Sequence, residues 1–370
     1  MKSKVYYSDV SAKGPEDSFQ TKVERLFDAC GATSVIKKKD LTAIKVHFGE
    51  MGNNTFLRPT LVQPIVKKVA ALGAKPFLTD SNTLYTGSRS DAVEHIWCAF
   101  RHGWLPPVVD APVIIADGLT GREQVEVKLP AGFILKSAKY GAAAAHADSM
   151  IVVSHVKGHL MAGLGGAIKN TGMGLASRAG KQAMHSDAKA SISEKRCISC
   201  GRCIAVCPAG AIELQKGKGA AVDTSKCMGC GECVTACREG AVKIRWDSSS
   251  DIFQKKMVEY TYAVLKDKKG RCAFFNFLLD ITPGCDCFGW SDTPIVPNIG
   301  ILASLDPVAI DAASAYLINS MPANMNSRIK KAVKGGEDKL GEANNVKWEI
   351  QLEYAEKTGL GTRDFEIVKC

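Results

Sequence analysis

The chain has 370 residues, of which 46% are hydrophobic, 23% are charged and 7% are aromatic, and its formal net charge is +10. This composition is typical of globular domains and excludes collagen-like, disordered and coiled-coil proteins. The sequence has no basic helix and no Arg/Lys run with interleaved aromatics, so we expect no nucleic-acid partner. No apolar run reaches the roughly 18 residues that a membrane span requires, so we expect no membrane insertion.

The N-terminal sequence, MKSKVYYSDVSAKGPEDS, lacks the apolar core of a signal peptide. We therefore expect a cytoplasmic protein, and structural disulfides are rare in that compartment. The 14 cysteines of the chain then require a different explanation.

Short strand patterns alternate with helix patterns before residue 191 and after residue 248, which predicts an α/β fold with a mostly parallel sheet flanked by helices. The strands are expected at residues 5–10, 43–48, 75–80, 112–117, 124–129, 149–155, 272–280 and 295–304. The helices are expected at residues 16–30, 59–73, 90–104, 251–267 and 306–320. The Lys-rich tail after Met321 is expected to be an amphipathic helical cover, and DSSSD at 247–251 a polar linker.

Polar side chains follow several of these strands at the point where each strand ends. In an open parallel sheet, ligands bind outside the carboxyl ends of the strands, so these segments are expected to converge. Lysines or histidines there would supply protons. The candidate catalytic residues are His47, Glu50, Asp80, His155, Lys157, His159 and Lys169.

Two further interpretations concern the same segments. His155 and His159, joined by His47 and Glu50, are candidate ligands of a transition metal, whereas the alternative is that these histidines hydrogen-bond to backbone in tight loops. The Gly-rich run 163–174 is a candidate anion loop, neutralised by Lys169, and the competing interpretation is close helix–sheet packing by its glycines. The loop residues proposed for the anion are Gly163, Gly165, Gly166 and Asn170.

A sequence repeat gives the best explanation of the cysteines. Residues 197–214 and 227–244 both contain C-x2-C-x2-C-x3-C, the spacing that holds [4Fe–4S] clusters in bacterial ferredoxins. In a two-cluster arrangement the fourth cysteine of each run ligates the other cluster. The first cluster would be held by Cys197, Cys200, Cys203 and Cys237, and the second by Cys227, Cys230, Cys233 and Cys207. Zinc would need two CxxC pairs, which leaves the third and fourth cysteine of each run unexplained.

Two smaller expectations accompany the repeat. The apolar stretches AIEL (211–214) and AVKI (241–244) are expected to pair as strands. Outside the repeat, Cys285 and Cys287 lie in the turn-rich loop PGCDCFGW. This pair is a candidate for a further metal site, a redox-active thiol or a substrate contact, and buried free cysteine is the alternative.

Three segments, residues 47–59, 154–174 and 299–312, resemble the DUF362 family, an uncharacterised family often fused to ferredoxin domains. Residues 190–246 resemble a bacterial two-[4Fe–4S] ferredoxin. The resemblance implies one discontinuous α/β domain, residues 1–190 and 249–370, with a ferredoxin-like α+β domain inserted at 191–248.

The leading hypothesis is a ferredoxin-linked oxidoreductase that relays electrons through two [4Fe–4S] clusters to a site in the α/β domain. It implies a redox partner protein that donates or accepts electrons. A small-molecule substrate and a further metal or anionic cofactor are the candidate occupants of the site. The alternatives are an electron carrier whose α/β domain docks a partner, and a metal- or cluster-handling factor.

Overall fold

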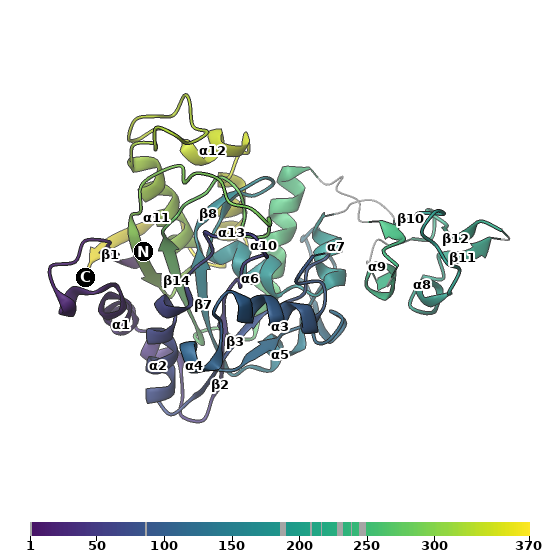
Figure 1. The fold of residues 1–370 in the computed structure, drawn as a ribbon, viewed down its shortest axis with the longest axis horizontal. Coiled ribbons are helices and arrows are strands. Elements are labelled where there is room, and N and C mark those ends of the chain that lie inside the picture. The colour runs from purple at the N-terminus through teal and green to yellow at the C-terminus, as the bar shows by residue number, and fades with distance from the viewer. Residues whose placement is uncertain are drawn as a thin grey trace.

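The structure is a computed structural model that describes residues 2–85, 87–185, 190–207, 209–215, 217–227, 232–237, 239–243 and 249–370. The chain forms an α/β body, and the cysteine repeat forms a smaller unit (residues 190–243, called the cysteine unit below) beside it (Figure 1). Across the described part of the chain, no helix combines the length and the apolar character that crossing a membrane requires.

The α/β body contains an eight-stranded sheet with the strand order β16-β1-β15-β14-β7-β2-β3-β4. These strands are β1 (Ser3–Asp9), β2 (Leu41–Lys45), β3 (Lys75–Asp80), β4 (Val113–Ile115), β7 (Ser149–His155), β14 (Cys272–Leu278), β15 (Gly300–Ser304) and β16 (Phe365–Lys369). β15 runs antiparallel to β1 and β14, whereas the other neighbouring strands are parallel. The predicted α/β fold with a mostly parallel sheet is confirmed.

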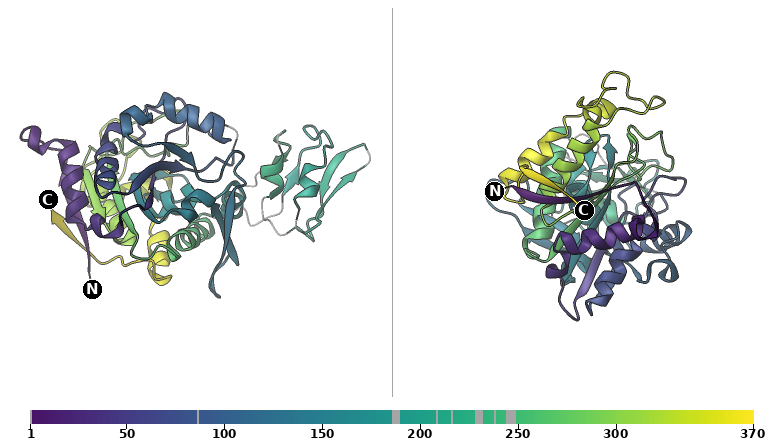
Figure 2. Two further views of the ribbon diagram at one scale, coloured as in Figure 1. Left: turned by 90° about the horizontal axis from the view of Figure 1, so that it is seen from below. Right: turned by 90° about the vertical axis from the view of Figure 1, so that its left-hand side faces the viewer.

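Helices cover both faces of this sheet (Figures 1 and 2). The first face packs against α1 (Phe19–Ala29), α2 (Gln63–Ala71), α3 (Ala92–Arg101) and α4 (Pro106–Val109). The second face packs against α5 (Ala142–His146), α6 (Ala167–Leu175), α10 (Ser250–Lys266) and α11 (Pro307–Ser320), with α7 (Arg178–His185), α12 (Lys339–Asn344) and α13 (Glu349–Lys357) around them. Covering on both faces explains why the central strands read as continuous apolar runs.

Strand β7 shows how one run serves both layers. All seven of its residues are buried. Because successive side chains of a strand point to opposite faces, Ile151 and Val153 pack in the core under α1 and α2, whereas Met150 and Val152 pack in the core under α6 and α11.

The predicted strands 75–80 and 149–155 coincide with β3 and β7. Within the described residues of the α/β body, four strands were missed, namely β6 (Ser137–Gly141), β8 (Lys157–His159), β9 (Gly163–Gly165) and β16. β6 pairs with the predicted β5 (Gln124–Lys128), and β16 pairs with β1, so the tail expected to be a helical cover ends as an edge strand. The linker expected at 247–251 is wrong in its second half, because Ser249 caps α10 and the helix begins at Ser250.

The cysteine unit has its own small core, in which Cys203 and Cys233 pack with apolar side chains. Its elements are β10 (Ser191–Ile192), α8 (Arg202–Ala205), β11 (Ile212–Gln215), β12 (Gly219–Val222), α9 (Glu232–Ala236) and β13 (Val242–Lys243). The expected pairing of 211–214 with 241–244 is wrong. β11 forms a hairpin with β12 through the tight turn at Gly217, and β13 pairs with β10 instead.

Asp306 ties three distant segments together. One carboxylate oxygen accepts from the backbone N–H groups of Val308 and Ala309 at the start of α11, and the other accepts from Ser3 and Thr362. We expect Asp306→Ala to lower the free energy of unfolding by about 2 kcal/mol, since it removes a helix cap and leaves other donors unpaired. Urea unfolding checks this. Glu24→Ala, on the exposed face of α1, is the matched control with a loss under about 0.5 kcal/mol, and an equal loss in both variants would contradict the assignment.

Candidate active-site cavity

The cavity lies where the strand order of the parallel sheet reverses. From β2 the chain adds β3 and β4 on one side, but β7 and β14 lie on the other side. Such a switch point leaves a crevice at the carboxyl ends of the two central strands, here β2 and β7. A cavity of about 530 Å³ occupies this position, lined by residues from both strand ends, from α6 and α7, and from the loop after β14.

Most of the residues predicted for the site line this cavity. They are His47, Asp80, His155, Lys157, His159, Gly165, Gly166, Lys169, Asn170, Cys285 and Cys287. Among the predicted residues of the α/β body, Glu50 and Gly163 do not line it. The convergence predicted from the strand ends is therefore observed, although the individual roles differ from those expected.

Asp80 is the buried carboxylate at the end of β3. Its Oδ1 lies 3.1 Å from the Lys45 ammonium and its Oδ2 lies 3.6 Å from the Arg89 guanidinium. Burial acts to raise the pKa of Asp80, but the charges of Lys45 and the neighbouring basic groups outweigh it and hold this pKa well below its usual range. Asp80 is therefore an anion that fixes two cations, rather than a proton donor.

Glu50 serves the site through Arg89. Its Oε2 lies 3.2 Å from the Arg89 Nε, and its Oε1 accepts from the backbone N–H of Ser88. Arg89 is 2% exposed, and its Nη2 donates to the Tyr85 hydroxyl at 2.7 Å. Glu50 thus orients a guanidinium that does line the cavity, which makes it a positioning residue and not a catalytic one.

His155 and Lys157 both bind Asp286, the residue between the two loop cysteines. The Asp286 carboxylate accepts from His155 Nδ1 at 2.9 Å and from the Lys157 ammonium at 2.6 Å. His155 Nε2 lies 2.7 Å from the Leu279 carbonyl oxygen, so both ring nitrogens face acceptors. The expected metal ligation by His155 is wrong for this arrangement, since no ring nitrogen is left to bind a metal.

His159 also has a local role. Its Nδ1 accepts from the backbone N–H groups of Met161 and Ala162, and its ring stacks on Phe253 at 6.1 Å. Burial holds the pKa of His159 well below its usual value, so the ring is neutral, and its Nε2 then carries the proton. His159 therefore fits the alternative interpretation, in which the histidine hydrogen-bonds to the backbone of a tight turn.

The Gly-rich loop binds a carboxylate of the protein itself. The N–H groups of Ala167 and Ile168, at the start of α6, donate to Asp311 at 2.7 and 2.9 Å. A Cβ at Gly166 would lie 2.3 Å from that carboxylate. The prediction that these amides cradle an external anion is therefore wrong, and close packing explains the glycine. Gly165, Lys169 and Asn170 still border the cavity.

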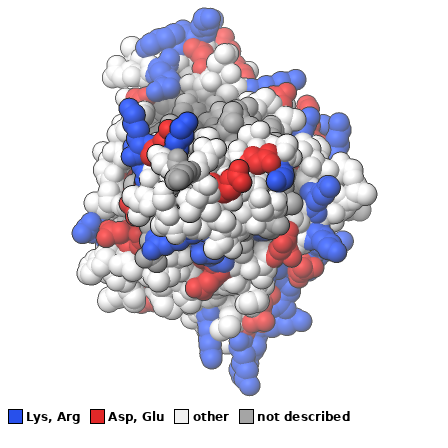
Figure 3. Space-filling model, turned by 90° about the vertical axis from the view of Figure 1, so that its right-hand side faces the viewer, with Lys and Arg blue, Asp and Glu red and all other residues white. Residues whose placement is uncertain are grey.

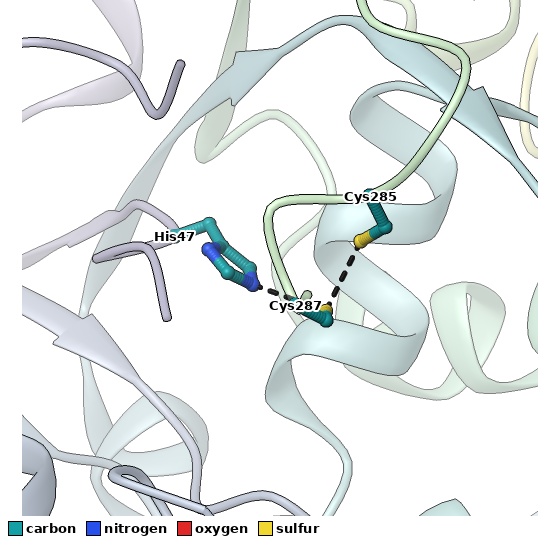
Figure 4. A group of neighbouring side chains, drawn as sticks. All are labelled: His47, Cys285 and Cys287. Carbon is teal, nitrogen blue, oxygen red and sulfur yellow. Dashed lines mark hydrogen bonds between the residues drawn. The ribbon is translucent and has the colours of Figure 1, made fainter. Parts of the chain in front are cut away.

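Cys285 and Cys287 both line the cavity. Figure 4 shows their side chains beside that of His47. Their sulfur atoms are 3.0 Å apart, His47 Nε2 lies 3.3 Å from the Cys287 Sγ, and the Lys169 ammonium lies 3.4 Å from the Cys285 Sγ. His47 and the two cysteines also form a group whose candidate metal-ligand atoms lie within 4.8 Å of one another. The distances alone therefore fit a metal site as well as a thiolate that is stabilised by its neighbours.

The two thiols are not equivalent. The hydrogen bond from the Cys285 thiol lowers the pKa of Cys287 well below that of an ordinary thiol, against burial and with help from His47 and Lys169. The same hydrogen bond, together with burial, raises the pKa of Cys285. Cys287 is therefore the thiolate of the pair, and thiolates are the reactive form of cysteine.

Several cavity residues were missed from the sequence. Arg89 and Lys181 bring buried cations, and Phe253 stacks at 4.7 Å on His185, which the sequence offered only as a weaker candidate. Lys181 donates to the Ala176 carbonyl oxygen at 2.6 Å and to the Ser81 hydroxyl. Burial lowers the pKa of Lys181 toward neutrality, although Asp117 opposes this. None of these residues follows a strand, so the strand-end argument had no signal for them.

The cysteine unit brings the first predicted ligand set together. Cys197, Cys200, Cys203 and Cys237 line one small cavity. Of the second set, Cys207, Cys227 and Cys233 are described, and Cys230 lies outside the described residues. The N–H groups of Ala220 and Ala241 donate to the Cys197 and Cys237 sulfurs at 3.3 Å.

A family model described as "Domain of unknown function (DUF362)" matches residues 42–316. No curated protein matches the chain. Among solved structures, the lactate racemase apoprotein from Thermoanaerobacterium thermosaccharolyticum is 13% identical, with a TM-score of 0.38, over 76% of this chain and 51% of that one. A Thermotoga maritima protein solved by the Northeast Structural Genomics Consortium is 9% identical, with a TM-score of 0.41, over 95% of this chain and 61% of that one. The chain thus spans between half and two thirds of both structures.

The thiolate character of Cys287 is testable by alkylation. We expect its rate with iodoacetamide to change little between pH 9 and pH 7, because a lowered pKa keeps the thiolate present, whereas an ordinary thiol slows roughly tenfold per pH unit below its pKa. Peptide mass spectrometry after timed quenching gives the rate. Lys169→Met should slow the reaction at pH 7, and Lys67→Met, on the exposed side of α2, should leave it unchanged. A tenfold slowing of the native protein between pH 8 and pH 7 would contradict the assignment.

Proposed function

We propose that this chain, which belongs to the DUF362 family, is an iron–sulfur oxidoreductase in which electrons pass through two [4Fe–4S] clusters of the cysteine unit to the cavity of the α/β body. In this proposal residues 191–248 are a ferredoxin-type domain inserted between residues 1–190 and 249–370. When bound, the clusters supply single electrons, and the residues of the cavity bind the substrate and handle protons.

The observation that carries the proposal is the position of Leu84. This side chain is 4% exposed and belongs to the hydrophobic cluster of the cysteine unit, with Cys203, Cys233 and Val234. It also lines the cavity. In addition, α7, which contributes Lys181 to the cavity, contacts α9. The cysteine unit and the cavity therefore share a wall, which is what an electron route between them needs.

The described cysteines fit a cluster better than zinc. Four cysteines from both halves of the repeat line one cavity, in the crossed pattern that two-cluster ferredoxins use. The Gly201 backbone has a φ of 72°, which lets the loop turn tightly between Cys200 and Cys203. The N–H groups directed at Cys197 and Cys237 stabilise thiolate ligands.

The charges of the cavity indicate an anionic small molecule as substrate. Lys157 is paired with Asp286, and Arg89 with Glu50. Within the described residues, Lys169 and Lys181 line the cavity without a carboxylate in ion-pair range. Because a buried cation is stabilised by a bound anion, these two lysines would bind an anionic group, and Lys181 is the better proton donor because its pKa lies below that of an ordinary lysine.

A redox partner protein would supply or remove the electrons. Figure 3 shows the face on the side of the cysteine unit, where Lys and Arg side chains are interspersed with Asp and Glu. A partner that docks there would meet both signs of charge.

The carrier alternative, in which the α/β body only docks a partner, predicts that His47→Ala leaves electron transfer intact. The oxidoreductase proposal predicts that the same variant loses substrate turnover.

The cluster content is the first test. Protein purified and reconstituted without oxygen should contain about eight iron and eight sulfide per chain. Cys237→Ser should lower the iron content to about four, because it removes one ligand of the first cluster. Cys272→Ser, at a buried position of β14 outside the repeat, is the control and should retain about eight. Substantially fewer than eight in fully reconstituted native protein would rule out the two-cluster proposal.

The anionic character of the cavity ligand has a separate test that needs no known substrate. Iodoacetate and iodoacetamide differ chiefly in charge, so the ratio of their rates with Cys287 reports the local potential. We expect this ratio to fall several-fold in Lys181→Met at pH 7, since the variant removes a buried cation from the cavity. Lys67→Met should not change it. A ratio that is the same in native protein and Lys181→Met would show that Lys181 does not attract anions into the cavity.

A further inference from the structure

The loop that carries Cys285 and Cys287 is held rigidly inside the cavity wall. The Glu50 N–H donates to the Asp286 carbonyl oxygen at 2.9 Å, and the Gly158 N–H donates to the Thr282 carbonyl oxygen at 2.8 Å. Cys285 is 3% exposed. The two sulfur atoms, 3.0 Å apart, therefore face each other in a fixed geometry at the cavity wall (Figure 4).

Both ring nitrogens of His47 already have partners, which disfavours metal ligation by this group. The Gly49 N–H donates to His47 Nδ1 at 3.0 Å. His47 Nε2 lies 3.3 Å from the Cys287 Sγ and 3.2 Å from the Arg89 Nη1, a group that can only donate. A ligating nitrogen needs its lone pair free for the metal, and metal-bound histidines almost always donate their other N–H group instead of accepting one.

The neighbouring charges point the same way. The Arg89 Nη1 lies 3.2 Å from His47 Nε2, and the Lys169 ammonium lies 3.4 Å from the Cys285 Sγ. Two buried cations beside the sulfur atoms stabilise thiolates and repel an incoming metal cation. The group is therefore built to hold anionic sulfur.

We propose that Cys285 and Cys287 form a redox-active dithiol–disulfide couple, which stores two electrons beside the substrate position. In the reduced state Cys285 carries a proton and Cys287 a negative charge. When the pair loses two electrons and the Cys285 proton, the Sγ–Sγ bond forms. When the disulfide gains two electrons and one proton, that bond breaks and the thiol and thiolate return.

The source of the electrons rests on the proposed function, since each of the two [4Fe–4S] clusters carries one electron at a time. The couple then converts single-electron delivery into a two-electron step in the cavity. Lys169 and His47 act on the couple as charge and hydrogen-bond partners of the sulfur atoms.

The chain offers a direct measurement of the couple. Trypsin cleavage after Arg271 and Arg328 releases residues 272–328, which contain Cys272, Cys285 and Cys287. Cluster-loaded protein is equilibrated without oxygen in mixtures of reduced and oxidised dithiothreitol, alkylated under denaturing conditions and digested. We expect three alkylated cysteines in the reducing mixture, but one, Cys272, in the oxidising mixture, with two mass units lost to a disulfide. Cys285→Ser and Cys287→Ser should each keep two alkylated cysteines in both mixtures, and Cys272→Ser should still form the disulfide.

Two results would overturn the couple. One is three alkylated cysteines in the native protein after the oxidising mixture. The other is one equivalent of metal beyond the cluster iron that is present in native protein and lost in both Cys287→Ser and His47→Ala, because the group would then be a metal site. The first measurement uses the native chain, so it does not depend on whether a variant folds.

A second arm separates this inference from the proposed function. The oxidised protein is treated with reduced methyl viologen, a one-electron donor, and the appearance of the alkylated pair is timed. Reduction at least tenfold slower in Cys237→Ser than in native protein supports the route through the clusters. Equal rates, with the disulfide forming normally, would leave the couple standing and would overturn the electron route.

Discussion

The geometry of the cavity depends on one buried carboxylate, that of Asp286. This side chain is fully buried, and it accepts from His155 and from Lys157, which lie on β7 and β8. Burial alone would raise its pKa, but the adjacent charges of His155 and Lys157 hold that pKa well below its usual range, so the carboxylate stays ionised. Breaking a buried pair of this kind typically costs about 3–5 kcal/mol, because a charge is left without a partner. Since Asp286 stands between Cys285 and Cys287, the same interaction that neutralises a lysine also fixes both sulfur atoms.

The remaining buried charges of the cavity show a second constraint. Lys45 and Arg89 are matched to Asp80 and Glu50, and all four are buried. Pairs like these seldom add net stability over an apolar core, because removing the charges from water costs about as much as their attraction returns. Their concentration at a strand switch point, together with strongly shifted pKa values, is instead a property of functional sites. The charges of these paired residues nearly cancel one another. Lys169 and Lys181 are then the lysines left to interact with a molecule that enters the cavity.

The fold was largely readable from the sequence, because buried parallel strands are continuous apolar runs and their ends are marked by polar residues. That reasoning placed His47, Asp80 and His155 at one sheet edge correctly. It failed where local backbone groups are hydrogen-bonded by a side chain that lies far away in the sequence. Asp311 could not be recognised as the partner of the α6 amides, and a Gly-rich loop at a helix start looks the same whether its anion is external or internal. Arg89 and Lys181 were missed for a related reason, since they reach the cavity from a loop and a helix whose own sequence patterns describe only local structure.

The three segments that resemble the family now have a common physical meaning. The 47–59 segment and the 154–174 segment clamp the cysteine loop from two sides. A Cβ at Gly52 would lie 2.4 Å from the Gly289 carbonyl oxygen, and one at Gly158 would lie 2.4 Å from that of Pro283. Both glycines therefore permit a backbone approach that a side chain would block. The third segment supplies Asp311, which fixes the start of α6 and with it Lys169. Residues far apart in sequence thus share the task of placing two cysteines and one lysine, and the short cavity wall at Leu84 then joins that arrangement to the cysteine unit.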